Sequence, residues 1–413
     1  MIADSTIWPL FHYQLDKVTF DDNAMHAYRK ANKIFADTIM PYLEDGDHIW
    51  VHDYHLMLLP LMIRKQAEKM HINITIGWFL HTPFPSCDFL DVLPARRDIL
   101  DGILGADLVG FQTDQARQNF LAACSQILYV KLYPEKCRAE ILIVCRKWWS
   151  TDTGILCGDR EVFVQTFPIG IEPSEFHSRL GKSCVQDTLR KMRGDLCDTK
   201  VILGVDRLDC IKGIPHKLHA FDKLLERRPD LIGQAVLLQV AVPSRDDLKS
   251  HQDLKEEIEH LVGKINGKYG MSPRMLYLAP RPQQTNPYLG KVNYVPVQFL
   301  YTSIDPDELT ALYAAADVCF VASTRDGMNL VCYEYVACHS NKAIKSSRGA
   351  MPAGSLVLSK FTGAAALLDG ALIINPWNKE SCASALAHAL SMNPADAAAR
   401  MSAMASKVEQ QTR

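Results

Sequence analysis

Short apolar runs alternate with longer amphipathic runs along most of this chain, and this alternation restricts its fold more than any other feature. In the first half, apolar and helix-like runs follow one another in three pairs: 48–52 and 56–70, 74–80 and 89–104, 106–113 and 114–128. The second half repeats the rhythm in three further pairs: 200–206 and 214–229, 235–242 and 253–267, 316–323 and 329–338. Strands that alternate with helices build parallel sheets covered by helices on both faces, so the chain is predicted to be an α/β protein.

Two such sets in 413 residues indicate two doubly wound domains, because a chain of this length exceeds what one hydrophobic core usually holds. The stretch FPIGIEPSEF, at 167–176, contains Pro and Gly and favours a turn over a continuing helix or strand. The predicted domains are therefore residues 1–172 and 173–413.

Three stretches do not follow the alternation. The stretch 129–150 has no clean period and contains two adjacent tryptophans, 271–292 is rich in Pro and Gln, and 340–355 is polar and contains Gly. We predict loops or insertions at all three.

Charge and composition exclude several classes of function. The 45 basic and 47 acidic side chains give a net charge of −2 with no long basic run, which argues against nucleic acid and anionic membranes as partners. The N-terminal residues lack the pattern of a signal peptide, and no apolar run reaches the ~20 residues of a membrane span. None of the 12 cysteines forms a CxxC pair, so reduced thiols in a cytoplasmic protein are the favoured interpretation over structural zinc.

Polar side chains follow five of the predicted strands. Asp53, His81, Arg207, Arg245 and Asp326 each come at or shortly after the end of an apolar run. In open parallel sheets, ligands bind outside the carboxyl ends of the strands. The five side chains are therefore candidates for a binding or catalytic site, although any one of them alone would mean little.

Two of these positions have competing interpretations. His52, Asp53 and His55 lie close enough in sequence to suggest a metal site, but a role in capping and packing is favoured because no outer ligands are evident. His81 is either a satisfied core histidine or a positioned functional side chain. Two prolines fix the loop that follows it, which suits the second interpretation.

The run DRLDCIKG places Arg207 and Lys212 five residues apart across a turn that ends at Gly213. Surface cations are usually only solvated. A planar guanidinium and a lysine ammonium directly after a buried strand are, however, well suited to binding a diphosphate. Arg245 follows the next strand in a similar way.

The run TRDGMNLVCYEY carries more polar chemistry than a strand-to-helix turn requires. If a helix begins near Asn329, the backbone amides of Met328, Asn329 and Leu330 are unpaired donors that favour an anion. Glu334 lies about one and a half turns further on and is suited to accept hydrogen bonds from vicinal sugar hydroxyls. The alternative, with Asp326 as an ordinary helix-start acid and Glu334 as a surface residue, stays open at this point.

Nine motifs in order resemble those of the trehalose-6-phosphate synthases, which are retaining glycosyltransferases of the GT-B type. They are IWPLFHY, HDYHLMLLP, GWFLHTPFPS, LVGFQT, FPIGI, VDRLDCIKGIP, INGKYG, STRDGMNLVCYEYV and NPWN, spread from residue 7 to 378. The resemblance implies two Rossmann-like doubly wound parallel-sheet domains that face a cleft.

The resemblance also implies a reaction. The family transfers glucose from UDP-glucose to glucose 6-phosphate, giving trehalose 6-phosphate and UDP without a metal or other cofactor. It retains anomeric configuration with no obvious enzyme nucleophile, which implies a front-face mechanism in which the leaving phosphate deprotonates the acceptor. The alternative is a catalytically impaired or regulatory homologue, or a subunit of a trehalose synthase complex. The partners expected besides the substrates are further copies of this chain or the subunits of such a complex.

The donor-binding residues implied by the resemblance lie in the second predicted domain. Arg207 and Lys212 would neutralise the diphosphate, and Ile304 would line the uracil pocket. Asp326 and the segment Gly327, Met328, Asn329 and Leu330 would hold the transferred glucose and its phosphate. Glu334 would bind the uridine ribose.

The acceptor-binding and catalytic residues are implied in the same way. Trp8 and Asp53 would contact the acceptor sugar phosphate, and Arg245 its phosphate group. His81 would lie against the donor glucose near the reacting carbon. Asp53 is expected to position the acceptor and not to act as a nucleophile, so His81 and Asp53 are the catalytic candidates and no metal ligand is expected.

The sequence departs from the family pattern at several points. Members carry a first strand with a glycine loop, an arginine and a tyrosine, none of which precedes Trp8 here, and they end in a further helix. We therefore expect a chain truncated at both ends, with its first domain incomplete. Cys210 stands where the family usually has Tyr, and 129–150 and 271–292 fall where the family is shorter, as true insertions or retained non-coding sequence. No phosphatase signature is present.

Overall fold

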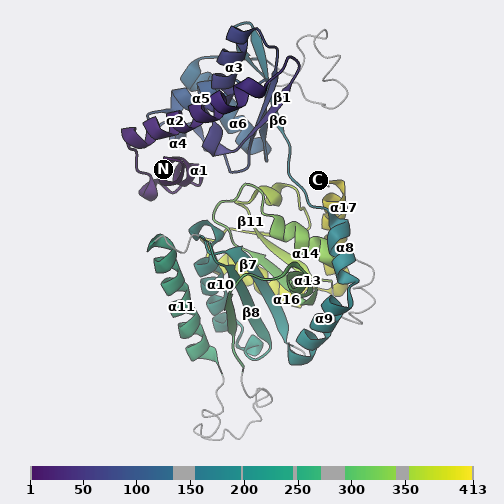
Figure 1. Cartoon of the computed structure of the whole chain (residues 1–413). Helices are drawn as coiled ribbons and strands as arrows, with labels where there is room; N and C mark the ends of the chain where they lie inside the picture. The colour runs from purple at the N-terminus through teal and green to yellow at the C-terminus, as the bar shows by residue number, and fades with distance from the viewer. Residues whose placement is uncertain are drawn as a thin grey trace, which may run out of the picture. The chain divides into compact units, whose positions relative to one another are not determined.

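The chain divides into two compact units, which we describe separately as unit 1 (Met1–Pro168) and unit 2 (Ile169–Arg413) (Figure 1). The computed structural model describes residues 2–133, 154–196, 199–244, 249–270, 294–340 and 353–411. The division falls four residues before the predicted domain boundary. Of the three stretches predicted as loops or insertions, 271–292 lies entirely outside the described residues, as do most of the other two.

Unit 1 is built on a six-stranded sheet in the order β1-β2-β3-β6-β5-β4. Its strands are β1 (His48–His52), β2 (Thr75–Leu80), β3 (Leu108–Phe111), β4 (Lys131–Tyr133), β5 (Gly154–Cys157) and β6 (Arg160–Thr166). The first three strands and β6 pair in parallel, as expected for an α/β protein.

One edge of this sheet is antiparallel, which the sequence did not predict. β5 pairs with β6 and β4 pairs with β5 in antiparallel register. Only two residues connect β5 to β6, and the first of them, Gly158, has φ 62°. So short a connection can only form a hairpin, since a parallel pair needs a crossover of a dozen residues or more. The prediction of a loop was thus wrong for 131–133.

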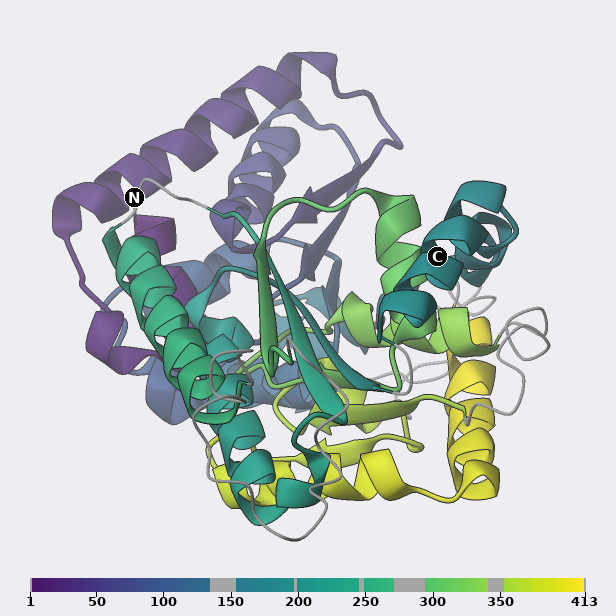
Figure 2. The same ribbon diagram turned by 90° about the horizontal axis from the view of Figure 1, so that it is seen from below.

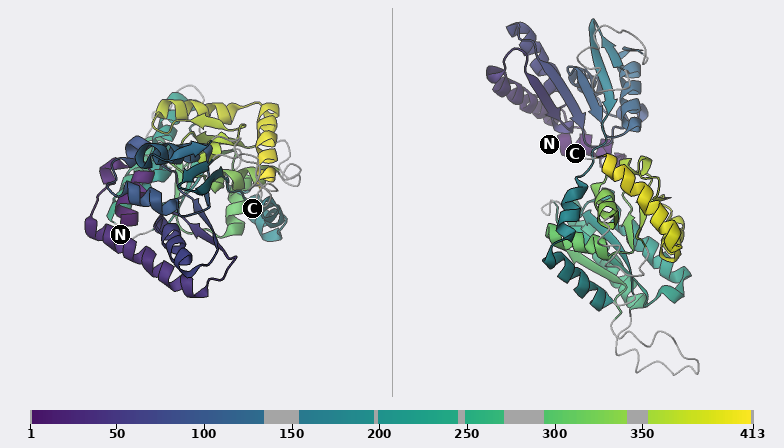
Figure 3. Two further views of the ribbon diagram at one scale, coloured as in Figure 1. Left: turned by 90° about the horizontal axis from the view of Figure 1, so that it is seen from above. Right: turned by 90° about the vertical axis from the view of Figure 1, so that its right-hand side faces the viewer.

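Helices cover the unit 1 sheet, with α3 packed on β2 and in contact with α2 and α5 (Figures 1 and 3). The helical elements are η1 (Ala3–Ile7), α1 (Trp8–Phe11), η2 (Leu15–Lys17), α2 (Asp22–Ile39), η3 (Met40–Tyr42), η4 (Tyr54–Leu56), α3 (Leu59–Met70), α4 (Cys87–Leu90), α5 (Arg96–Ile103), α6 (Asp114–Ala123) and η5 (Cys124–Leu128). The run predicted as one helix over 89–104 forms two, because Pro94 between α4 and α5 interrupts the backbone hydrogen bonding.

Unit 2 contains a second six-stranded sheet, in the order β12-β11-β10-β7-β8-β9, and every pair is parallel. Its strands are β7 (Lys200–Arg207), β8 (Ala235–Val242), β9 (Val297–Tyr301), β10 (Val318–Val321), β11 (Ser355–Ser359) and β12 (Leu372–Ile374). Successive side chains of β7 enter different cores. Val201 and Leu203 belong to one hydrophobic cluster and Ile202 to another, as the two-residue period of a strand requires.

Two groups of helices build these two cores (Figure 2). One face of the sheet is covered by α10 (Ile214–Arg227), α11 (Lys249–Tyr269) and α16 (Lys379–Ser391). The other is covered by α8 (Pro173–Leu180), α9 (Ser183–Leu196), α13 (Pro306–Ala315), α14 (Leu330–Ser340) and α17 (Pro394–Gln410). Short 3-10 turns complete the unit at η6 (Cys210–Lys212), η7 (Pro229–Leu231) and η9 (Gly363–Ala366). The predicted α/β class with parallel sheets is confirmed.

No helix in the part of the chain that the structure describes has both the length and the apolar character needed to cross a lipid bilayer.

Candidate functional site

The carboxyl end of β7 carries two of the predicted site cations. Arg207 is the last residue of β7 and is exposed. The chain then turns through η6, which Asp209 caps by accepting a hydrogen bond from the Ile211 N–H at 3.4 Å. Lys212 is the last residue of η6, so the cap and the 3-10 turn fix where its side chain starts.

Gly213 allows this turn to lie against the end of β10. Its φ is 68°, and a Cβ at this position would lie 2.1 Å from the carbonyl oxygen of Ala322. Beside it, the backbone N–H of Thr324 donates to the carbonyl of Ile211 at 2.7 Å. Only glycine tolerates both the left-handed backbone conformation and the close approach to Ala322. The turn after β7 can therefore hydrogen-bond to the end of β10.

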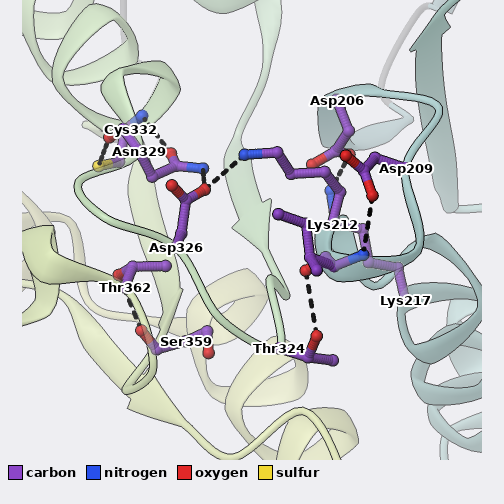
Figure 4. Close-up of polar contacts among 11 residues, drawn as sticks. Asp206, Asp209, Lys212, Lys217, Thr324, Asp326, Asn329, Cys332, Ser359 and Thr362 are labelled. Carbon is purple, nitrogen blue, oxygen red and sulfur yellow. Dashed lines mark hydrogen bonds and ion pairs between the residues drawn. The ribbon is translucent and has the colours of Figure 1, made fainter. Parts of the chain in front are cut away.

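Lys212, Asp326 and Asn329 form a contiguous polar group, which we call the Lys212 cluster (Figure 4). The Lys212 ammonium lies 2.6 Å from Asp326 Oδ2, and both side chains are only 13% exposed. The Asn329 amide donates to the same carboxylate oxygen at 3.3 Å. A cation, a carboxylate and an amide thus meet at the ends of two neighbouring strands, which suits recognition of both phosphate and sugar hydroxyls.

The helix after β10 begins at Leu330, one residue later than predicted, and Asn329 caps it. Asn329 has φ 71°, and its Oδ1 accepts from the Cys332 N–H at 3.3 Å. The N–H groups of Asn329, Leu330 and Val331 precede the first N–H that has an acceptor within the helix, so the helix itself cannot pair them. These donors and the helix dipole favour an anion beside the Lys212 cluster.

Backbone hydrogen bonds fix Asp326 to the loop that follows β11. The Asp326 N–H donates to Phe361 O at 3.0 Å, and the Gly363 N–H donates back to Asp326 O at 3.2 Å. Asp326 also forms an isolated parallel bridge with Thr362, whose hydroxyl donates to Ser359 O at 2.9 Å (Figure 4). The carboxylate is therefore attached to a backbone with little freedom to move.

The remaining predicted donor residues lie on the same unit. Glu334 is half-buried on α14, and its Oε2 accepts from the Tyr313 hydroxyl at 2.7 Å. Ile304 is half-buried in the loop between β9 and α13 and packs against the core. Arg245 lies outside the described residues.

A buried ion pair lies next to Arg207, and the sequence did not predict it. Lys217 Nζ is 2.5 Å from Asp206 Oδ2, both side chains are 1% exposed, and the Gln239 amide donates to the same oxygen at 2.8 Å. A Cβ on Gly204 would lie 2.1 Å from Gln239 Oε1 and 2.9 Å from Lys217 Nζ, so only glycine leaves room for the network. The ion pair ties the end of β7 to α10 (Figure 4), and the Gln239 amide ties it to β8.

In unit 1, Asp53 and His81 meet at the ends of β1 and β2. Asp53 has φ 69°, its N–H donates to Phe79 O at 2.7 Å, and its Oδ1 accepts from the His81 N–H at 3.3 Å. The His81 ring contacts His52, with Nε2 and Nδ1 3.2 Å apart. Burial lowers the pKa of His52, and the charge of His81 lowers it further.

Trp8 belongs to an N-terminal segment that packs around these strand ends. Trp8 is half-buried on α1, with its ring centroid 4.4 Å from that of His12. The preceding η1 packs against η4, which directly follows Asp53. The Tyr13 hydroxyl accepts from the Ser86 N–H at 3.0 Å and so tethers the loop after His81.

The metal interpretation of His52, Asp53 and His55 gains no support from the geometry. Across the described ranges, no group of three His, Cys, Asp or Glu side chains is arranged to hold a metal ion.

The sequence did not predict three contacts near the site: His52 with His81, Tyr313 with Glu334, and Lys217 with Asp206. Only the position of Lys217 could have been noticed from the sequence. It stands between Ile214, Leu218 and Phe221 on the apolar side of its helix, where a lysine needs a buried partner. The other two contacts join residues too far apart in sequence for any local pattern to show.

Comparison with known proteins gives one family. The model of glycosyltransferase family 20 matches residues 1–275 and 282–413. The alpha,alpha-trehalose-phosphate synthase [UDP-forming] of Pichia angusta is 43% identical over 393 residues, which is 95% of this chain and 73% of the relative. The synthase of the same name from Schizosaccharomyces pombe is 43% identical over 390 residues, 94% of this chain and 67% of the relative.

Solved structures agree. A UDP-forming alpha,alpha-trehalose-phosphate synthase from Burkholderia xenovorans, in complex with glucose 6-phosphate, superposes with a TM-score of 0.83 at 30% identity over 100% of this chain and 80% of that one. An E. coli protein bound with UDP-2-fluoro glucose gives a TM-score of 0.83 at 32% identity, with the same coverage.

Proposed function

Because this chain belongs to glycosyltransferase family 20, we propose that it makes trehalose 6-phosphate and UDP from UDP-glucose and glucose 6-phosphate. The observation that carries the proposal is the Lys212 cluster beside the start of α14, at the ends of β7 and β10. Lys212 and the backbone amides at the start of α14 can bind a phosphate, and the Asp326 carboxylate can bind a sugar, so one half-buried group serves both parts of the donor.

We propose for the donor the roles that the family resemblance implies. Arg207 and Lys212 neutralise the diphosphate, and Ile304 lines the uracil pocket. Asp326 and the backbone that runs from Gly327 through Met328 and Asn329 to Leu330 hold the transferred glucose and its phosphate. Glu334 accepts hydrogen bonds from the ribose. The support is that Lys212 and Asn329 both donate to the Asp326 carboxylate, although Lys212 and Asp326 are 114 positions apart.

The acceptor roles fall to unit 1 and to Arg245. Asp53 and Trp8 contact glucose 6-phosphate, Arg245 binds its phosphate, and His81 lies against the donor glucose near the reacting carbon. The hydrogen bond from the His81 N–H to Asp53 supports a shared function for these two, because each holds the other in place.

The chemistry is a single displacement with retention. The bond between the glucose C1 and the oxygen of the UDP β-phosphate breaks, and a bond from C1 to the C1 hydroxyl oxygen of glucose 6-phosphate forms on the same face. The hydroxyl proton passes to the departing phosphate, so no enzyme carboxylate is required as nucleophile or base. Negative charge grows on the diphosphate, where the cations and amides stabilise it most.

A non-catalytic regulatory homologue is the alternative, and the relatives do not favour it, since those compared above are named as synthases. A Kluyveromyces lactis relative, 43% identical over 94% of this chain and 70% of its own length, is named as a 56 kDa subunit. We therefore propose that this chain also assembles, with itself or with other subunits, which light scattering of the purified protein tests.

A cytoplasmic location is proposed on the basis of the thiols. Eight cysteines in the described ranges carry free thiols, namely Cys87, Cys124, Cys157, Cys184, Cys319, Cys332, Cys338 and Cys382. Free thiols at this density suit a reducing compartment.

The deciding experiment measures UDP release from UDP-glucose with and without glucose 6-phosphate. Acceptor-dependent release is expected, and it should fall at least about 100-fold in Lys212→Ala. The matched control is Lys182→Ala, an exposed lysine of unit 2 paired with Asp307 at 2.8 Å, which should retain activity. Well-folded protein that releases no UDP in response to the acceptor overturns the proposal.

A further inference from the structure

Tyr313 is a fully buried tyrosine whose hydroxyl donates a hydrogen bond to the carboxylate of Glu334, the proposed ribose ligand. It lies on α13, and its Oη is 2.7 Å from Glu334 Oε2 on α14. Burial, together with the nearby charge of Glu334, holds the pKa of Tyr313 well above its usual range. The hydroxyl therefore keeps its proton at any working pH and always donates to the carboxylate.

The backbone of Tyr313 is held as firmly as its side chain. The Gly354 N–H donates to Nδ1 of His339 at 3.2 Å, so Nδ1 is an acceptor and the ring proton resides on Nε2. That Nε2–H then donates to the Tyr313 carbonyl at 2.9 Å. His339 lies on the same helix as Glu334, so α13 and α14 are joined twice through one tyrosine.

This double attachment restricts Glu334 itself. A glutamate side chain has three rotatable bonds and, when half-exposed, samples many rotamers. A buried donor on Oε2 selects one of them and leaves Oε1 at a fixed position relative to the helix start. A group that must meet two vicinal hydroxyls needs that kind of orientation before the ligand arrives.

We propose that Tyr313 is a positioning residue that orients the Glu334 carboxylate and thereby sets the preference of the donor site for ribose over 2′-deoxyribose. The inference rests on the proposed function, because Glu334 has to be the ribose ligand. Tyr313 itself touches no substrate. Its contribution appears in nucleotide selectivity and not in the chemical step.

The experiment measures the dissociation constants of UDP and 2′-deoxy-UDP by calorimetry for the whole chain. The wild-type protein should prefer UDP by about tenfold or more, the range of one hydrogen bond to a charged group. Tyr313→Phe should bring this ratio down about three- to tenfold, chiefly by weakening UDP. Glu334→Gln should bring it close to one.

Tyr335→Phe is the matched control. It removes a hydroxyl from another buried tyrosine, which is next to Glu334 on α14. The Tyr335 hydroxyl donates to the Asp317 carbonyl at 3.2 Å and not to the Glu334 carboxylate. A general loosening of the α13–α14 packing would weaken UDP and 2′-deoxy-UDP alike and leave the ratio unchanged. A smaller ratio in Tyr313→Phe alone therefore supports a positioning role.

Two other outcomes overturn the inference and differ in what they leave standing. If Glu334→Gln abolishes the preference and Tyr313→Phe keeps it, Tyr313 has no positioning role and the ribose site stands. If Glu334→Gln also keeps the preference for UDP, then both the positioning role of Tyr313 and the assignment of Glu334 as the ribose ligand are wrong. Should Tyr313→Phe not fold, a crystal structure of the wild-type protein with UDP decides, since loss of the Tyr313–Glu334 contact there refutes the inference.

Discussion

The Lys212 ammonium lies 2.6 Å from the Asp326 carboxylate, and this contact joins the turn after β7 to the turn after β10. The two residues were assigned to different parts of the donor, the diphosphate and the glucose. Their contact means that the positive charge offered to the diphosphate is partly compensated by a neighbouring negative one.

Removal of that negative charge should separate binding from transfer. In Asp326→Asn we expect UDP to bind about three- to tenfold more tightly, because the Lys212 charge is no longer offset. Transfer to glucose 6-phosphate should fall at least about tenfold, because the proposed ligand of the transferred sugar is lost. Calorimetry with UDP and the UDP-release assay measure the two effects. The control is Asp222→Asn, which removes a carboxylate of α10 that pairs with Lys268 at 2.9 Å. Weaker UDP binding in Asp326→Asn would contradict the prediction.

The buried pair Asp206–Lys217 should matter for stability. Lys217→Met leaves the Asp206 carboxylate buried without its cation, which should lower the free energy of unfolding by about 3–5 kcal/mol. Lys223→Met makes the same change on the same helix, where the lysine pairs with Glu226 at 3.1 Å near the surface, and should leave the free energy of unfolding nearly unchanged. Urea denaturation compares the two, and equal effects would mean that the buried pair carries no special weight.

Gly213 should not tolerate a side chain. Gly213→Ala introduces both an unfavourable φ and a contact with the Ala322 carbonyl, so we expect a loss of about 1–3 kcal/mol and weaker UDP binding as the turn moves. Gly263→Ala lies within α11 with no atom near the added Cβ, and should instead stabilise the protein by about 0.5–1 kcal/mol. Normal stability in Gly213→Ala would show that the turn is more adaptable than the contact implies.

The ring contact between His52 and His81 should be visible in the titration of His52. Because burial and His81 lower its pKa, His52 should titrate below its ordinary value of 6.5. Any stability that this lowering reflects is present above pH 6.5 and is lost as the pH falls through the lowered pKa. In His81→Gln the pKa should move back part of the way, since burial remains the larger cause. Imidazole signals in NMR spectra report this, and an unmoved His52 would mean that the rings do not interact in solution.

Chelation tests the role of metals. We expect EDTA to leave the transferase activity unchanged within about twofold, because Arg207, Lys212 and the start of α14 already supply positive charge to the diphosphate. Restoration of a lost activity by a divalent cation would show that the site works with a metal.

Much of the fold was predictable because its central strands are almost wholly apolar. β8, with the sequence AVLLQVAV, is buried on both faces and is apolar at every position except Gln239, and a run of that kind has few other interpretations. β9, with VQFLY, and the short β12 are only partly buried at the sheet edges and gave no comparable signal. The β4–β5 pairing depends on a partner more than twenty residues away and was missed for that reason.

The candidate site divides along the same line. Strand ends were predictable, since polar residues that follow apolar runs mark them, and this placed Arg207, Asp326 and His81. Which of these side chains meet was not predictable, because the contact between Lys212 and Asp326 depends on two strands being neighbours in the sheet. The Tyr313–Glu334 contact depends likewise on how two helices pack.

β7 passes between two hydrophobic cores and is paired on both sides, with β8 and β10, before it ends at Arg207. Its amides should therefore be among the slowest of unit 2 to exchange with solvent, and the turn that carries Lys212 follows this strand directly. A nucleotide that binds there meets side chains whose supporting backbone is already ordered. Little conformational entropy should then be lost on binding, because the contacts need no rearrangement of the backbone to form.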